Sequence, residues 1–128
     1  MMHLKALVIF VFIIGFKQSY AQNDPDILQI FDQFVTSNAV TGICEKPDEE
    51  TLTHFLANFQ MVSVLASKKL KEIYPEYTKD NISRTMKKRS ELITQKVNEI
   101  VEAKGCTDPD VKIIIKRFYV QAKWKPGQ

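Results

Sequence analysis

The sequence has 128 residues, of which 45% are hydrophobic and 26% are charged, with a formal net charge of +3. When an apolar N-terminal leader is set aside, the remaining length suits one small domain. Two cysteines allow a single intrachain disulfide and exclude a larger disulfide framework. One histidine and two paired cysteines in residues 22–128 cannot fill a tetrahedral metal site.

Residues 1–21 have the pattern of a secretory signal peptide. Lys5 gives a weakly positive start, residues 6–16 form a short apolar run, and Ser19 and Ala21 supply the small residues of a cleavage site. The run is shorter than the roughly 20 residues that span a bilayer. We expect cleavage before Gln22 and a secreted, extracellular domain, residues 22–128, without a transmembrane segment. An uncleaved anchor and a buried strand are the alternatives.

The first expected helix begins at Asp24 and ends near Ser37. Asp24 is the predicted N-cap and Pro25 the predicted first residue. Its apolar stripe consists of Ile27, Ile30, Phe31, Phe34 and Val35. Residues 38–43 are expected to form a loop, in which Gly42 supplies backbone freedom.

Residues 47–73 form the second expected helix. Pro47 suits its first position, acidic residues follow in the first turn, and Pro75 should end it. Apolar residues recur at helical spacing: Leu52, Phe55, Leu56, Phe59, Val62, Ala66, Leu70 and Ile73. Met61, Val64 and Leu65 widen this apolar arc, which places the helix in the centre of the fold with neighbours on two sides.

The third expected helix, residues 80–104, returns antiparallel to the second. It turns these residues inward: Ile82, Met86, Ile93, Val97, Ile100 and Val101. Gly105 supplies a left-handed C-terminal cap. A last helix, residues 109–124, is capped by Thr107 or Asp108 and has an apolar face of Val111, Ile114, Ile115, Phe118 and Ala122.

A disulfide between Cys44 and Cys106 is expected from the cysteine count and from the hairpin, which returns Cys106 to the end where Cys44 lies. A loop of this length adds roughly 4 kcal/mol of stability by chain entropy. A reactive thiol or an intermolecular bridge is the alternative. The predicted fold is therefore an all-α, four-helix domain built on a long antiparallel hairpin and stapled by one disulfide.

Asn81, Ile82 and Ser83 form an N-glycosylation sequon. In a chain that enters the secretory pathway of a eukaryote, we expect a glycoprotein. The alternative is an unoccupied sequon whose asparagine serves as a helix cap.

Catalytic chemistry has few candidates. His54 is the one histidine in residues 22–128, and no second histidine or unpaired cysteine completes a nucleophile–base pair. Phosphate-binding glycine loops are absent as well. We predict no catalytic residue, no cofactor, no metal and no enzymatic activity.

Charge divides unevenly along the chain. Residues 22–67 hold seven acidic residues and one basic residue, a net charge of −6; residues 68–128 hold fifteen basic and eight acidic residues, a net charge of +7. The candidate basic binding patch consists of Arg84, Lys87, Lys88, Arg89, Lys112, Lys116 and Arg117. An anionic surface or protein partner, or charge complementarity within the fold, explains this asymmetry. The secretory compartment disfavours nucleic acid, so we expect no nucleic-acid partner.

A second candidate site is the interior. Residues that could line a cavity for a lipid-like ligand are Phe31, Phe34, Phe55, Phe59, Met86 and Phe118. Ordinary core packing is the alternative.

Three function classes remain. The first is a secreted, non-enzymatic binding protein, a venom, salivary or body-fluid effector; the second is an extracellular carrier of a small apolar ligand; the third is a membrane-active toxin that uses the basic C-terminal helix and Trp124. The general style, with a leader, one disulfide and amphipathic helices, resembles small secreted proteins of venoms, saliva and body fluids. The six-cysteine pattern of insect odorant-binding proteins and saposins is absent. This resemblance identifies no functional residue.

Overall fold

The computed structural model describes residues 26–125, which form four helices and no strand. These are α2 (Ile27–Cys44), α3 (Glu49–Ile73), α4 (Lys79–Lys104) and α5 (Pro109–Lys123). The all-helical fold with four helices is confirmed. The expected signal peptide, its cleavage before Gln22 and the helix start at Asp24 and Pro25 lie outside the described residues.

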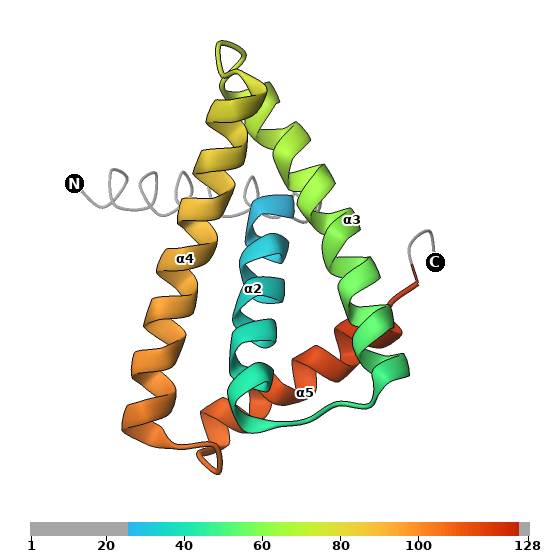
Figure 1. Cartoon of the computed structure of the whole chain (residues 1–128), viewed down its shortest axis with the longest axis vertical. Helices are drawn as coiled ribbons and strands as arrows, with labels where there is room; N and C mark the ends of the chain where they lie inside the picture. The colour runs from blue at the N-terminus through green and yellow to red at the C-terminus, as the bar shows by residue number, and fades with distance from the viewer. Residues whose placement is uncertain (1–25, 126–128) are drawn as a thin grey trace, which may run out of the picture.

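The helices form a triangle with one helix inside it (Figure 1). Helices α3 and α4 meet at the tip, near residues 74–78, and diverge towards the base, which α5 crosses. Helix α2 lies between α3 and α4 and contacts all three of its neighbours. The predicted close pairing of α3 with α4 is therefore not confirmed, because α2 occupies the space between the two long helices.

The central position of α2 corrects the prediction that the 47–73 segment is the central helix. Helix α3 contacts α2 and α5, and α4 to a lesser extent. Leu56, Val64 and Leu65 of α3 are nevertheless 46%, 50% and 41% exposed, so part of its wide apolar arc is left uncovered. Ile100 of α4, expected inside, is 43% exposed. Helical periodicity locates an apolar face, but it does not say how much of that face another helix covers.

Helix α2 also extends further than expected. The predicted loop at 38–43 is helical, and Gly42 lies inside the helix. The extension buries Val40 and Thr41, which are 2% and 1% exposed. This burial outweighs the modest helix propensity of asparagine, threonine and glycine at these positions.

Side-chain caps fix where the helices begin. The Asp26 carboxylate accepts a hydrogen bond from the Leu28 N–H (3.0 Å) and is the N-cap of α2. Asp48 accepts from the Thr51 N–H (2.8 Å), and α3 therefore begins at Glu49 and not at Pro47. Helix α5 ends one residue before Trp124, with Asp108 as its N-cap.

The core divides into two clusters. We call the first the aromatic cluster; its buried members are Phe31, Phe34, Val35, Phe55, Val62, Ala66, Leu70, Met86, Phe118 and Ala122. We call the second the valine cluster; its buried members are Val40, Val97, Val101, Val111 and Ile115. The valine cluster joins the end of α2, the last turns of α4 and the first turns of α5.

The predicted disulfide between Cys44 and Cys106 is confirmed. The two Cα atoms lie 5.5 Å apart, an ordinary spacing for a disulfide, and both residues pack against the valine cluster. Cys44 ends α2 and Cys106 lies in the turn before α5. Gly105 has a φ of 83°, as expected for a glycine after a helix, but its ψ of 163° is extended and not left-handed helical.

Candidate functional site

The six residues predicted to line an internal ligand cavity are mostly the core itself. Neighbouring phenylalanine rings have centroids 4.1 to 5.9 Å apart, and Phe55 stacks on Phe118 at 4.1 Å. Phe31, Phe34 and Phe59 complete this packed set. Met86 is the one member of the six that also lines a surface groove.

Three of the four predicted patch residues on α4 take part in ion pairs. Arg84 pairs with Asp80 (2.9 Å) and Lys87 approaches Glu91 (4.0 Å), both on the surface of the same helix. Exposed pairs of this kind contribute little to stability. Lys88 is exposed.

Arg89 has a structural role. Its guanidinium donates two hydrogen bonds to the Asp32 carboxylate of α2, at 2.6 and 2.8 Å. These hydrogen bonds raise the pKa of Arg89 above its ordinary value, so the guanidinium stays ionised. The contact joins the acidic first half of the chain to the basic second half. The guanidinium of Arg89 is therefore paired within the fold. This ion pair is an example of the charge complementarity within the chain that was one of the two explanations for the charge asymmetry.

The basic residues of α5 form a separate group. Lys112 and Lys116 are exposed and Arg117 is half-buried. About 15 residues of α4 separate Arg89 from Lys104, or ~22 Å of helix, before the chain turns into α5. The seven predicted patch residues therefore fall into two groups, one on α4 and one on α5.

The outer face of α5 combines positive charge with exposed apolar side chains. Residues 111–125 contain five basic side chains and no acidic one. Ile113, Val120 and Trp124 are 57%, 67% and 40% exposed. At 3.6 residues per turn, Lys112, Lys116 and Lys123 share one side of this apolar strip, within about 40° of one another. We call Lys112, Ile113, Lys116, Val120, Lys123 and Trp124 the α5 face.

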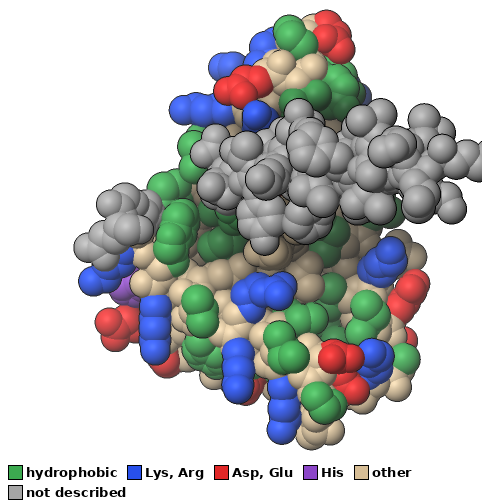
Figure 2. Space-filling view, turned by 180° about the vertical axis from the view of Figure 1, so that it is seen from behind, with side chains coloured by type: hydrophobic (Ala, Val, Ile, Leu, Met, Phe, Trp, Pro, Cys, Tyr) green, Lys and Arg blue, Asp and Glu red, His purple; other side chains and the backbone are tan. Residues whose placement is uncertain are grey.

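Figure 2 shows basic side chains along the lower part of the molecule, where α5 crosses the base in Figure 1, with hydrophobic side chains between them. Among the described residues, no side chain of the α5 face takes part in an ion pair. The opposite side of α5 is buried through Val111, Ile115 and Phe118. The fold thus holds the helix in place and leaves this charged and apolar strip open to solvent.

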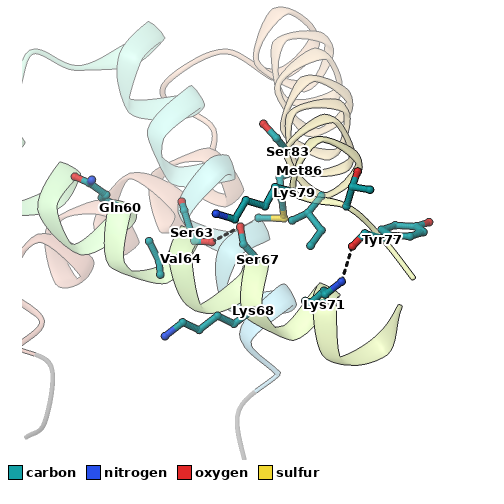
Figure 3. A pocket seen from close by; sticks show the side chains of 12 residues that line it. Gln60, Ser63, Val64, Ser67, Lys68, Lys71, Tyr77, Lys79, Ser83 and Met86 are labelled. Atoms are coloured by element: carbon teal, nitrogen blue, oxygen red, sulfur yellow. Dashed lines mark hydrogen bonds between the residues drawn. The ribbon is translucent and has the colours of Figure 1, made fainter. Parts of the chain in front are cut away.

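A groove of about 760 Å³ lies between α3 and α4 near the tip (Figure 3). Ser63 and Ser67 of α3 form one wall, and Ile82 and Met86 of α4 form the other. The sequence predictions did not include this groove. The sequence pattern that could have indicated the groove is the pair Ser63 and Ser67, four residues apart, with Val64 and Lys68 beside them on the same helical face. That pattern indicates a groove only once it is known that α4 diverges from α3.

His54 is exposed and lies at a shallow hollow of about 310 Å³ with Glu50, Tyr119 and Trp124. Burial raises the pKa of the Tyr119 hydroxyl, and the negative charges of Glu45 and Asp48 act in the same direction, so the phenol stays protonated at neutral pH. In residues 26–125 no group of three or more histidine, cysteine or acidic side chains is placed to hold a metal ion.

Asn81 occupies the third position of α4. Its side-chain oxygen accepts hydrogen bonds from the backbone N–H and hydroxyl of Thr78 (3.1 and 2.9 Å), and Thr78 in turn caps the Asn81 N–H. The side-chain nitrogen, the atom that carries the sugar in a glycoprotein, takes no part in this capping box. Capping and glycosylation are therefore compatible at Asn81.

None of the helices formed by residues 26–125 combines the length and the apolar character needed to cross a membrane. No family model matches the chain, and no curated protein or solved structure is similar to it. Over residues 26–125, the fold defines a small all-helical class of protein with four helices and one disulfide. A disulfide is typical of proteins that reside in an oxidising, extracellular type of environment.

Proposed function

We propose that this protein is a secreted, non-enzymatic binding protein that attaches to anionic membrane surfaces through its α5 face. The observation that carries the proposal is the strip of exposed Ile113, Val120 and Trp124 flanked by Lys112 and Lys116, with no acidic residue in 111–125. The disulfide and the leader sequence support secretion.

The chemistry of the strip favours a lipid surface over an acidic protein. A basic residue near an anionic leaflet contributes about 1 kcal/mol, and three such lysines lie side by side on α5. Tryptophan and aliphatic side chains beside them suit the interface between lipid headgroups and acyl chains. An acidic protein would need pockets for these apolar side chains, whereas a lipid surface accepts them without a fixed shape.

The mode of attachment is peripheral. The inner side of α5 is packed in the core through Ile115 and Phe118, so the helix cannot turn its largest apolar face to lipid without unfolding. Only three apolar side chains remain for insertion. We therefore expect reversible binding that salt weakens, and no leakage from vesicles.

The test is co-sedimentation of the secreted chain with vesicles of phosphatidylcholine alone and with 30 mol% (about one third) phosphatidylserine added. Binding should require the anionic lipid. The charge-reversal variant K112E/K116E/K123E should bind about a hundredfold more weakly, since three contributions of ~1 kcal/mol are lost. The matched control is K87E/K88E/K96E on α4, which replaces three exposed lysines, changes the net charge by the same amount and should bind like the wild type.

Three outcomes contradict the proposal. Equal binding to neutral vesicles would mean that charge is not recognised. Equal losses in both variants would mean that net charge matters and the α5 face does not. Retention on heparin without vesicle binding, lost in K112E/K116E/K123E, would assign the same face to a polyanion or acidic protein.

Secretion is tested on the same preparation. The denatured mass of the chain secreted from eukaryotic cells should correspond to a start at Gln22, less two hydrogens for the disulfide, with added sugar that disappears in the Asn81→Gln variant. A chain that stays inside the cell, or retains residues 1–21, would contradict the secreted assignment.

A further inference from the structure

The α3 wall of the groove is largely apolar because the hydroxyls of its two serines are already hydrogen-bonded. The hydroxyl of Ser63 donates to the carbonyl of Phe59 (2.8 Å), and that of Ser67 donates to the carbonyl of Ser63 (2.9 Å). These serines therefore present small side chains whose hydrogen bonds are made within α3. Ile82 and Met86 face them from α4. The small side chains on one wall keep the groove open.

The rim of the groove is positively charged. Lys68, Lys71 and Lys79 line it, and none of the lining residues within 26–125 is acidic. Lys68 and Lys79 are exposed, and neither takes part in an ion pair among the described residues. Figure 3 shows the Lys79 side chain extending towards the α3 wall. A bound anion would thus meet lysines that no carboxylate of residues 26–125 neutralises.

The shape of the groove is held by its closed end. The Lys71 ammonium donates to the carbonyls of Pro75 and Tyr77, at 2.6 and 2.7 Å, across the turn that joins the two helices (Figure 3). The rings of Tyr74 and Tyr77 stack at 4.7 Å in the same turn. These contacts fix the separation of α3 and α4 where the groove begins.

We infer that this groove binds a single-chain fatty carboxylate, with the acyl chain along the serine wall and the carboxylate at Lys68 and Lys79. The volume of about 760 Å³ lies within the usual range of small-molecule sites. The α3 wall from Gln60 to Lys71 is about 16 Å long, which suits one extended acyl chain. The site is independent of the α5 face, which lies at the base of the triangle.

Charge favours this occupant over a second copy of the protein. Two identical grooves would bring two lysine rims together, and like charges at close range repel. A fatty carboxylate supplies the missing negative charge and covers Val64, which is 50% exposed. The class of ligand is therefore set by the apolar walls and the positive rim together.

The experiment is isothermal titration of the secreted, delipidated chain with tetradecanoate and, separately, with its neutral methyl ester. Tetradecanoate should bind one per chain, and the ester at least tenfold more weakly. The variant K68E/K79E should lose at least tenfold in affinity for tetradecanoate. The matched control, K112E/K116E, should bind tetradecanoate like the wild type, and this control also separates the groove from the α5 face.

The variant Ser67→Trp fills the groove and should abolish binding, while Leu92→Trp, at an exposed position on α4, should not. Circular dichroism and thermal unfolding show whether each variant is folded; if Ser67→Trp is not, the two rim substitutions decide, because both lysines are exposed. No binding to the wild type, or equal binding of acid and ester, would overturn the inference. A wild-type dimer that Ser67→Trp dissociates, without tetradecanoate binding, would instead assign the groove to a second copy.

Discussion

The aromatic cluster and the valine cluster are built from different side chains and are secured by different means. Large rings of Phe34, Phe55 and Phe118 interlock in the first, and no covalent bond crosses it. The second consists of small branched side chains around Val40 and Val97, and the disulfide packs against it. The aromatic cluster is stabilised by its large buried area, whereas the valine cluster is stabilised by the covalent link between α2 and the start of α5.

This difference has a physical basis. Each aromatic ring buries a large area and gains a further ~0.5–1.5 kcal/mol from ring-to-ring contact. A valine buries less, and the valine cluster also has to hold the diverging end of α4 against α2 and α5 (Figure 1). The covalent link compensates for the smaller area at the base. Substitutions at the two ends should therefore have effects of different origin.

Phe55→Ala should cause the largest loss of stability. Phe55 is fully buried, stacks on Phe118 and contacts Phe34, so its removal leaves a cavity that the surrounding rings cannot fill. We expect a loss of about 4–5 kcal/mol in the free energy of unfolding, measured by urea denaturation. Phe55→Leu should lose less than half as much. Equal losses for the two variants would mean that ring volume does not secure this cluster.

The double variant C44A/C106A removes the link at the base. Its disulfide closes a loop with a sequence separation of 62 residues, which corresponds to about 4 kcal/mol of chain entropy. The loss should appear in the free energy of unfolding without a change of helix content in the folded state. Hydrogen exchange should also become faster for the last turns of α2 and α4 than for the aromatic cluster. An equal increase in exchange rate in both clusters would contradict the inference that the two clusters are secured by different means.

Several parts of the fold follow from local sequence. The apolar spacing, Pro75 after the second helix and the cap residue Asp108 predict where the helices run to within a few residues, because these signals act locally. The disulfide follows from the cysteine count. The extension of α2 through Gly42 does not, since it depends on the burial of Val40 among residues of α4 and α5 that are distant in sequence.

The placement of α2 between α3 and α4 is likewise a property of the whole molecule. Similar helix lengths and a short turn favoured a hairpin, but the aromatic side chains of α2 have greater area to bury than the serine face of α3. The same cause left Val64 exposed and opened the groove. The α5 face was predicted in part, through Lys112 and Lys116. Its separation from the basic residues of α4 required the structure.

Asn58→Ala tests the connection between the aromatic cluster and the end of α5. The buried side-chain amide of Asn58 donates to the carbonyls of Gln121 and Trp124, both at 2.8 Å. Without it, two acceptors near the core lose their donor, at a cost of about 1–3 kcal/mol. The exposed control Asn98→Ala should change stability by less than ~0.5 kcal/mol. A loss confined to the fluorescence of Trp124, with unchanged stability, would show that Asn58 only orders the last turn.

Asp48 should give the base of the molecule a weak dependence on acid. Its carboxylate accepts hydrogen bonds from the N–H and the hydroxyl of Thr51, and these lower the pKa of Asp48 below its ordinary value. Because the folded-state pKa is the lower one, this contribution is fully present above the ordinary pKa of an aspartate. It is lost as the pH falls through the folded-state pKa.

The comparison variant is Asp48→Asn, since asparagine caps a helix about as well but does not titrate. Between pH 6 and pH 3 (a window of about 3 units around the ordinary aspartate pKa), the wild type should lose more stability than the variant, by urea midpoint. The extra loss should concern α3 at its first turn, and it should persist in Phe59→Leu, which alters the aromatic cluster without touching the cap. Parallel pH curves for wild type and Asp48→Asn would mean that the cap acts through its hydrogen bonds alone and that the ionisation of Asp48 adds nothing to stability.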